Sequence, residues 1–211
     1  MGAEFKSAFE SLLGQLFAHQ YPAHPEFDTE IKAAVIRKIW PEVLKAIEAP
    51  GQRGLVQDAG VRRLVRAVVN PCQLGQMGET HLLIEPRWQS RFLQSHARDG
   101  GGAITVARLR QWIDMPAPMG LPLELQNLII LAFAASTNRR FTMRGGPFEP
   151  TIDSVPDELE LKVAQVLEGQ YLTENRFLLE AEVRRHGEAI GQGDALNDVV
   201  LHPGKSTRMI E

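Results

Sequence analysis

The sequence predicts a mainly α-helical fold with short β hairpins, which is an α+β arrangement. Three observations lead to this fold class. Apolar residues recur at helical spacing in several segments, short β-branched runs lie between those segments, and the glycine pair at 145–146 separates two strand candidates. With 211 residues, of which 44% are hydrophobic, the chain is large enough to bury a core in one or two small domains.

Residues 1–27 are expected to form an N-terminal helix and a linker. The apolar residues of this segment follow helical spacing, and Pro22 and Pro25 end the pattern because proline cannot continue a helix. The segment carries Glu4 and Glu10 and lacks the apolar region of a signal peptide, and no run in the sequence is long and apolar enough for a transmembrane helix. A soluble cytoplasmic protein without a membrane partner is therefore expected.

Residues 28–86 predict a reduced winged-helix-like unit. Asp28 or Thr29 can cap a first helix, and a second helix runs through "VRRLVRAVV". A short strand is expected at 55–57 between the two helices, and a loop at "QLGQMGE" precedes a second strand at 81–84. The order is helix, strand, helix, loop, strand.

Residues 87–155 predict the complete element order of a winged-helix domain. The pattern indicates a helix, a short strand, two further helices, a strand, a tight turn at the wing tip and a returning strand. The corresponding ranges are 88–97, 104–106, 107–113, 121–135, 139–144, 145–147 and 148–152. Together with residues 28–86, this segment would give tandem winged-helix-like units.

C-terminal helices are expected over residues 156–191. Apolar residues recur between Leu159 and Val183, and Arg184-Arg185-His186-Gly187 has cations and a glycine where a helix usually ends. Residues 192–211 have little apolar pattern and are expected to be a flexible tail.

The third helix of the 87–155 unit, "LPLELQNLIILAFAAST", is not expected to read DNA bases. It has no Lys or Arg, and Glu124 in its first turn would repel phosphate. Only Gln126 and Asn127 could contact a base edge, and the helix is apolar on nearly every side. We therefore expect a helix that is buried in the core or in an interface.

The candidate nucleic-acid contacts are five arginines, Arg139, Arg140, Arg144, Arg62 and Arg66. The first three flank the glycine turn, whose backbone amides could also donate to an anion. The other two share one face of an earlier helix. The alternative is that both groups are ordinary solvated surface, with the hairpin arginines paired to acids such as Glu149 and Asp153.

No catalytic, metal or cofactor site is expected. Cys72 is the only cysteine, so it cannot form an internal disulfide, and we expect it to be a small buried hydrophobic residue. The six histidines show no metal-ligand spacing. "HPGKST" contains the Gly-Lys-Ser of a phosphate-binding loop, but Val199 stands where that motif needs glycine. The net charge of -3 excludes a surface that is basic throughout.

Four segments resemble a known family. They are "YPAHPEFD", "NPCQLGQMGETHLLIEPRW", "ITVARLRQWID" and "GLPLELQNLIILAFAASTNRRFTMRGGP". They resemble the region downstream of the ATPase core in very large bacterial phage-resistance proteins, the P-loop ATPases of phage growth limitation and BREX-type defence systems. The resemblance covers roughly residues 20–150. It implies a fragment of a multi-domain defence ATPase whose nucleotide site lies outside these residues.

Three functional hypotheses follow. The first is a non-catalytic interaction or coupling region of such an ATPase, with other domains or subunits of the defence complex as partners. The second is a sequence-tolerant DNA-binding module that uses the basic wing. The third is a nucleotide-binding enzyme with an atypical phosphate loop at Gly204-Lys205-Ser206, which requires nucleotide binding that Lys205→Ala abolishes.

Overall fold

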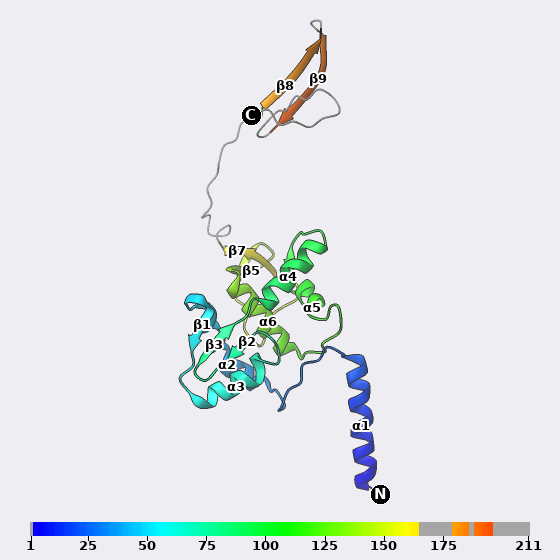
Figure 1. Ribbon diagram of the computed structural model, residues 1–211, viewed down its shortest axis with the longest axis vertical. Helices are drawn as coiled ribbons and strands as arrows, with labels where there is room; N and C mark the ends of the chain where they lie inside the picture. Colours follow the sequence, from blue (N-terminus) through cyan, green and yellow to red (C-terminus); the bar gives the residue numbers. More distant parts are fainter. Residues whose placement is uncertain (1, 165–178, 186–187, 196–211) are drawn as a thin grey trace. The chain divides into compact units, whose positions relative to one another are not determined.

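The computed structural model describes residues 2–164, 179–185 and 188–195 (Figure 1). The chain divides into two compact units, Met1–Gly169 and Gln170–Glu211. The described residues of the first unit form six α-helices and two small antiparallel sheets, so the predicted mixed α+β class is confirmed.

The first sheet lies in the N-terminal half of the first unit. This half contains α1 (Gly2–Gln20), α2 (Ala33–Glu48), the 3-10 helix η1 (Pro50–Gln52), β1 (Arg53–Leu55), α3 (Ala59–Val69), β2 (Gly75–Met77) and β3 (His81–Ile84). The three strands are antiparallel in the order β1-β3-β2. The helices predicted in this half are present, but α2 begins at Ala33 with Lys32 at its N-cap, so the prediction that Asp28 or Thr29 caps it is wrong. The first strand begins and ends two residues earlier than predicted.

β2 corrects the prediction of a loop at "QLGQMGE". The backbone N–H of Met77 donates to Oδ1 of Asn70 at 2.9 Å, which holds the strand against the end of α3. Gly75 passes so close to β3 that a Cβ there would lie 2.3 Å from the carbonyl oxygen of Leu83. Gly75 is therefore needed for strand pairing, because any side chain would collide with the neighbouring backbone.

The second sheet lies in the C-terminal half of the same unit. This half contains α4 (Arg87–Arg98), β4 (Ile104–Thr105), α5 (Val106–Ile113), α6 (Leu123–Ser136), β5 (Arg139–Met143), β6 (Gly146–Phe148) and β7 (Glu160–Val163). Its strand order is β4-β7-β5-β6. The predicted hairpin is present as β5 and β6, but β6 ends at Phe148, four residues before the predicted end. The strand that joins β5 to β4 is β7.

The predicted C-terminal helices over 156–191 are wrong wherever the structure describes them. Residues 160–163 form β7, and the second unit contains an antiparallel pair, β8 (Leu179–Arg185) and β9 (Glu188–Ala195). Leu159 and Leu161 are both buried although they are two residues apart, which is the period of a strand. Residues 165–178 of the predicted helices and 196–211 of the predicted tail lie outside the described residues, and residues 192–195 of that tail belong to β9.

One hydrophobic cluster joins the two halves of the first unit. α2 packs against α6, and buried side chains from both sheets belong to the same cluster. Ile39 of α2, Leu82 of β3 and Leu128 of α6 are each fully shielded from solvent. The segments predicted as two winged-helix-like units therefore share a core, which fixes the surface of one half relative to the other.

Candidate functional site

α6 does not offer a base-reading surface. The helix is buried continuously from Asn127 through Ala134, as its apolar sequence predicted. Asn127 is 1% exposed, donates to the carbonyl oxygen of Ile152 at 2.9 Å and accepts from Arg110. The amide of Gln126 donates to the carbonyl oxygen of Leu121 and its Oε1 accepts from Arg110. Both polar side chains that could have contacted a base thus hold the interior together.

The hairpin of β5 and β6 presents two of the three predicted wing arginines to solvent. Arg140 and Arg144 are exposed, and Arg144 and Gly145 form the turn with positive φ angles of 50° and 84°. Arg139 is half-buried, its Nε has no hydrogen-bond partner among the described residues, and burial lowers the pKa of its guanidinium. The prediction that all three arginines contact nucleic acid stays a prediction, but Arg139 is the least accessible of them.

Lys162 is a cation of this surface that the sequence did not reveal. β7 places Lys162 directly across from Arg140, so the two side chains share one face of the sheet. Glu160 lies on the same strand, and its carboxylate pairs with Lys162 at 3.6 Å. The hairpin also borders a hollow of about 320 Å3 that includes Arg140, Phe148 and Glu149. The predicted helix over this segment concealed the pairing.

The two predicted arginines of α3 bind backbone of the chain itself. Arg62 donates to the carbonyl oxygens of Val56 and Gln57, at 2.9 and 2.6 Å. Arg66 donates to the carbonyl oxygen of Gly78 at 2.6 Å and, more weakly, to that of Met77. These bonds fasten α3 to the ends of β1 and β2. A phosphate contact would therefore have to share guanidinium groups that already stabilise the fold.

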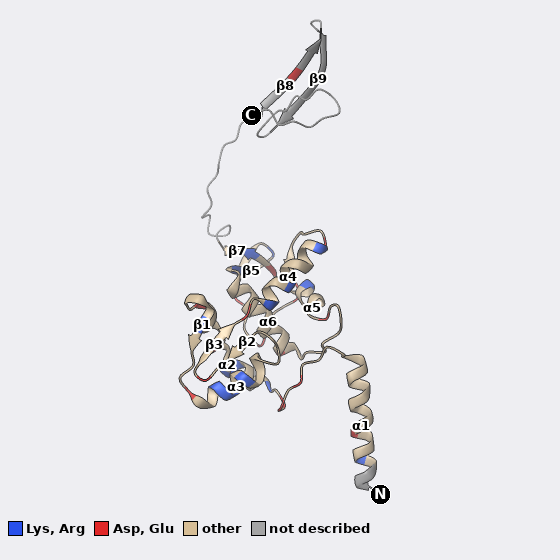
Figure 2. Cartoon of the chain, viewed as in Figure 1, with Lys and Arg blue, Asp and Glu red and all other residues tan. Residues whose placement is uncertain are grey.

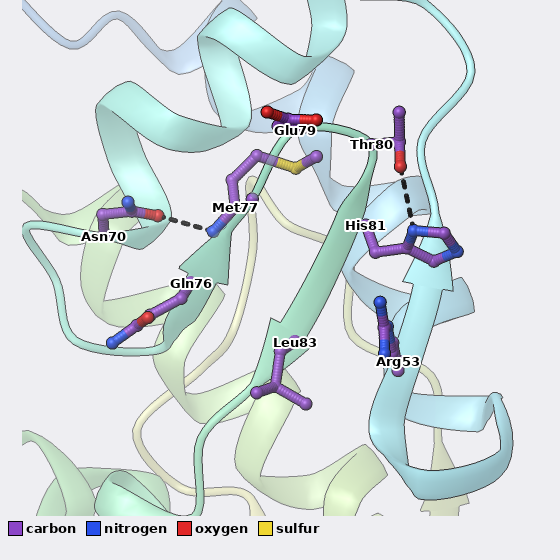
Figure 3. Close-up of a pocket in the computed structure, with 9 residues that line it drawn as sticks. Arg53, Asn70, Gln76, Met77, Glu79, Thr80, His81 and Leu83 are labelled. Atoms are coloured by element: carbon purple, nitrogen blue, oxygen red, sulfur yellow. Dashed lines mark hydrogen bonds between the residues drawn. The ribbon is translucent and has the colours of Figure 1, made fainter.

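A polar hollow of about 470 Å3 lies beside the first sheet (Figure 3). Arg53 of β1 and His81 of β3 lie near one another at one side of it, and Glu79 lies at the turn between β2 and β3. The Thr80 hydroxyl lies 2.9 Å from Nδ1 of His81. The hollow thus offers a cation, an imidazole and a carboxylate. In the sequence, Glu79 beside His81 is too common a combination to predict a site.

The described ranges add no metal-binding cluster to these surfaces. No group of three His, Cys, Asp or Glu residues among them could hold a metal ion. Cys72 is fully buried, and burial raises the pKa of its thiol to about 12. Gly204-Lys205-Ser206 lies outside the described residues. Within the described part, no helix has the length and apolar character to cross a membrane.

The family comparison concerns the first unit. Residues 34–134 match the family model described as the BREX System ATPase PglY protein 5th domain. This match covers 101 of the 211 residues, just under half of the chain. The resemblance to BREX-type phage-defence ATPases is confirmed over these residues. The match runs from α2 into α6, so the PglY region contains the first sheet and ends before the β5–β6 hairpin.

A second similarity covers a shorter segment. Over 59 residues the chain is 95% identical to an NAD kinase of Ectopseudomonas mendocina (strain ymp). It is 85% identical over the same length to an NAD kinase of Pseudomonas fluorescens (strain SBW25) and 86% identical to one of Pseudomonas putida (strain GB-1). The match covers 28% of this chain, and the chain spans about a fifth (20%) of each of these relatives. No solved structure matches the chain.

If the PglY match and the NAD kinase match do not overlap, the NAD kinase match must follow the PglY match in the sequence. A segment of 59 residues does not fit into residues 1–33, and outside the PglY match it fits only within residues 135–211. Any such placement includes residues 153–193, and therefore β7. The strand that completes the second sheet would then come from the NAD-kinase-like segment.

Proposed function

We propose that the chain is a non-catalytic docking and coupling region of a BREX phage-defence ATPase, built on two winged-helix-like units. Its partners are other domains or subunits of the defence complex. The observation that carries this proposal is the burial of α6, which occupies the position of the DNA-reading helix in a winged-helix order. A helix enclosed in the core positions neighbouring surfaces and does not enter a groove.

The pairing of the strands supports the winged-helix-like description. In the first half, β1 follows α2 and pairs with β3, which also pairs with β2. In the second half, β4 follows α4 and pairs with β7, which also pairs with β5. Each half thus has a strand between two helices, β1 between α2 and α3 and β4 between α4 and α5, that pairs with the last strand of the same sheet in the sequence. After these elements the halves differ, because the second has a helix, α6, before β5 and a fourth strand, β6, in its sheet.

α1 supplies a surface suited to docking. Phe5, Phe9, Leu12 and Leu16 recur at spacings of three and four residues and are 75%, 52%, 53% and 57% exposed. Apolar side chains that cluster in solvent mark protein interaction sites more often than an ordinary surface. We therefore place the docking contact on this face of α1.

The test is association of this chain with a PglY ATPase from which the fifth domain has been deleted, measured by isothermal titration calorimetry. We expect a complex that weakens at least about tenfold in a Leu12→Glu/Leu16→Glu variant, because each new carboxylate would be buried in the contact. Ser7→Glu/Ser11→Glu adds the same charge to the opposite face of α1 and should leave the affinity unchanged. Absence of a complex, together with an unchanged ATPase rate on adding the chain, would falsify the proposal.

A second candidate function is DNA binding through the hairpin. The observation that favours it is the cross-strand position of Arg140 and Lys162, with Arg144 at the adjoining turn. Fluorescence anisotropy with labelled duplex and single-stranded DNA, at about 50 and 200 mM salt, spans the range over which phosphate contacts weaken strongly. Salt-sensitive binding that disappears in an Arg140→Gln/Arg144→Gln/Lys162→Gln variant would favour this function, and binding that persists would exclude it.

A further inference from the structure

α4 carries a row of arginines that none of the functions above uses. Arg87, Arg91 and Arg98, with Gln94 between them, fall on one side of the helix at 3.6 residues per turn. Figure 2 shows this basic stretch of α4 and a separate one on α3. A hollow of about 630 Å3 follows the row, and Met115 and Pro116 form part of its other wall. No acidic residue lines it.

Arg91 gives the hollow its shape. Its Nη2 donates to the carbonyl oxygen of Ile113 at 2.8 Å and to that of Met115, and its guanidinium lies 4.8 Å above the ring of Trp88. These contacts fix the chain that follows α5 as the facing wall. Burial and, next, the positive charge of Arg87 lower the pKa of Arg91, and the charge of Asp114 acts in the opposite direction.

Arg87 and Arg98 stand at the two ends of the row, and neither is fully matched by acid. Arg87 is exposed in the first turn of α4, where no acidic residue lies and where a cation is unfavourable to the helix dipole. It forms no hydrogen bond or ion pair with any described residue. Among the described residues, Arg98 forms an ion pair only with Asp99, with 3.4 Å between Nε and Oδ1. The carboxylate of Asp99 also accepts a hydrogen bond from Nε1 of Trp112 at 2.8 Å.

We propose that this face of α4 binds the sugar-phosphate backbone of a nucleic acid. Arg87 and Arg98 are separated by about 16 Å along the helix axis, which corresponds to roughly five phosphates of one strand. A small anion cannot contact both ends, whereas an extended polyanion can. Guanidinium groups match phosphate oxygens in a bidentate manner, and the amide of Gln94 adds the kind of polar donor that contacts the backbone.

Such binding is independent of base sequence, because every contact is directed at phosphate. It also differs from the wing candidate, since it places the nucleic acid on α4 and inside the PglY region, whereas β5 and β7 follow that region. The two surfaces can therefore be separated by substitution.

The test measures anisotropy of a labelled 20-nucleotide single strand and of the matching duplex against the full chain, over a salt series. The unmodified chain should bind both with salt-sensitive affinity. An Arg87→Gln/Arg98→Gln variant removes two phosphate contacts, so the slope of log K against log salt for duplex should fall by about 1.8 in magnitude. Affinity at low salt should fall about tenfold or more. Arg87→Lys/Arg98→Lys keeps both charges and should keep most of the slope.

The matched control is Lys38→Gln/Arg63→Gln, which removes the same charge from exposed positions on α2 and α3. The proposal is supported if the α4 variant loses binding, the control retains it and both unfold at the same temperature as the unmodified chain. It is overturned if neither nucleic acid binds at low salt, if the control loses as much affinity as the α4 variant, or if only the wing variant loses binding. Tighter binding of poly-glutamate at the same row would also overturn it, in favour of an acidic polypeptide.

Discussion

Arg110 of α5 and Asn127 of α6 form a hydrogen bond inside the second half of the first unit, with Nη2 of Arg110 donating to Oδ1 of Asn127 at 2.9 Å. The same nitrogen of Arg110 donates to the carbonyl oxygen of Val155 at 2.8 Å, and the amide of Asn127 donates to that of Ile152 at 2.9 Å. Two helices of the PglY region thereby hold the segment that leads into β7. Asn127 is one of the two α6 residues that the sequence offered for base contact. It instead links α5, α6 and the segment before β7 in the interior, and we call this set of hydrogen bonds the clamp.

We predict that Asn127→Leu destabilises the first unit strongly. The substitution preserves approximate volume but leaves the Arg110 guanidinium and the Ile152 carbonyl oxygen with one partner fewer in a buried place, so the free energy of unfolding should fall by about 2–3 kcal/mol. Urea denaturation followed by circular dichroism measures the loss. Gln111→Leu on the exposed side of α5 should change it by less than about 0.5 kcal/mol. Equal stability of the two variants would show that the clamp contributes nothing.

Gly75→Ala should weaken the first sheet. The added Cβ would lie 2.3 Å from the carbonyl oxygen of Leu83, and backbone cannot move aside without breaking the pairing of β2 with β3. We expect a loss of about 1–3 kcal/mol in the free energy of unfolding. Gly78→Ala serves as the control, because its Cβ would be 3.5 Å from the nearest atom and should be tolerated. The unfolding temperatures of the two variants are compared. A Gly75→Ala variant as stable as the control would contradict the close approach of Gly75 to the backbone of Leu83.

The sequence predicted the helices of the first unit well because their apolar periodicity is strong, although the start of α2 was misplaced. It failed at β2 and β7, where the deciding information is not local. Gly75 is typical of a loop until β3 is brought alongside it. Leu159 and Leu161 already have the two-residue spacing of a strand, but the longer apolar run to Val183 favoured a helix when no neighbouring strand was known.

The candidate sites show the same limit. Hydropathy predicted that α6 is buried, but it gave no sign that Arg62 and Arg66 would be occupied by backbone carbonyl oxygens. Lys162 became part of the hairpin surface only through strand pairing. The arginines of α4 were visible at helical spacing, yet the hollow beside them depends on the 113–116 segment, which Arg91 holds in place.

Leu161→Ala tests whether β7 is an integral strand of the second sheet. Leu161 is 3% exposed and pairs with Ile104 of β4 on one side and Phe141 of β5 on the other. Removing a buried leucine side chain should lower the free energy of unfolding by about 2–5 kcal/mol. Val163→Ala, at a residue 37% exposed on the same strand, should cost much less. Chemical denaturation measures both losses, and similar small effects would mean that the sheet does not depend on β7.

Cys72 should be unreactive in the folded chain and should make stability fall at alkaline pH. Burial raises the pKa of its thiol from 9.0 to about 12, so the neutral thiol is favoured in the folded state. This contribution is fully present below pH 9 and is lost as pH rises from 9 towards 12, because the unfolded chain ionises first. Between pH 7.5 and 10, the unmodified chain should lose about 1 kcal/mol more unfolding free energy than a Cys72→Ala variant.

Denaturant titrations of both proteins at the two pH values measure this difference. Labelling with a thiol reagent at pH 8 provides a second readout, since the folded chain should react far more slowly than the same chain in denaturant. The carbonyl oxygen of Cys72 accepts from Nε1 of Trp88 at 2.8 Å, which ties this residue to α4 and means that labelling requires the core to open. Rapid labelling of the folded chain, or identical pH profiles for the two proteins, would show that the thiol is accessible to solvent.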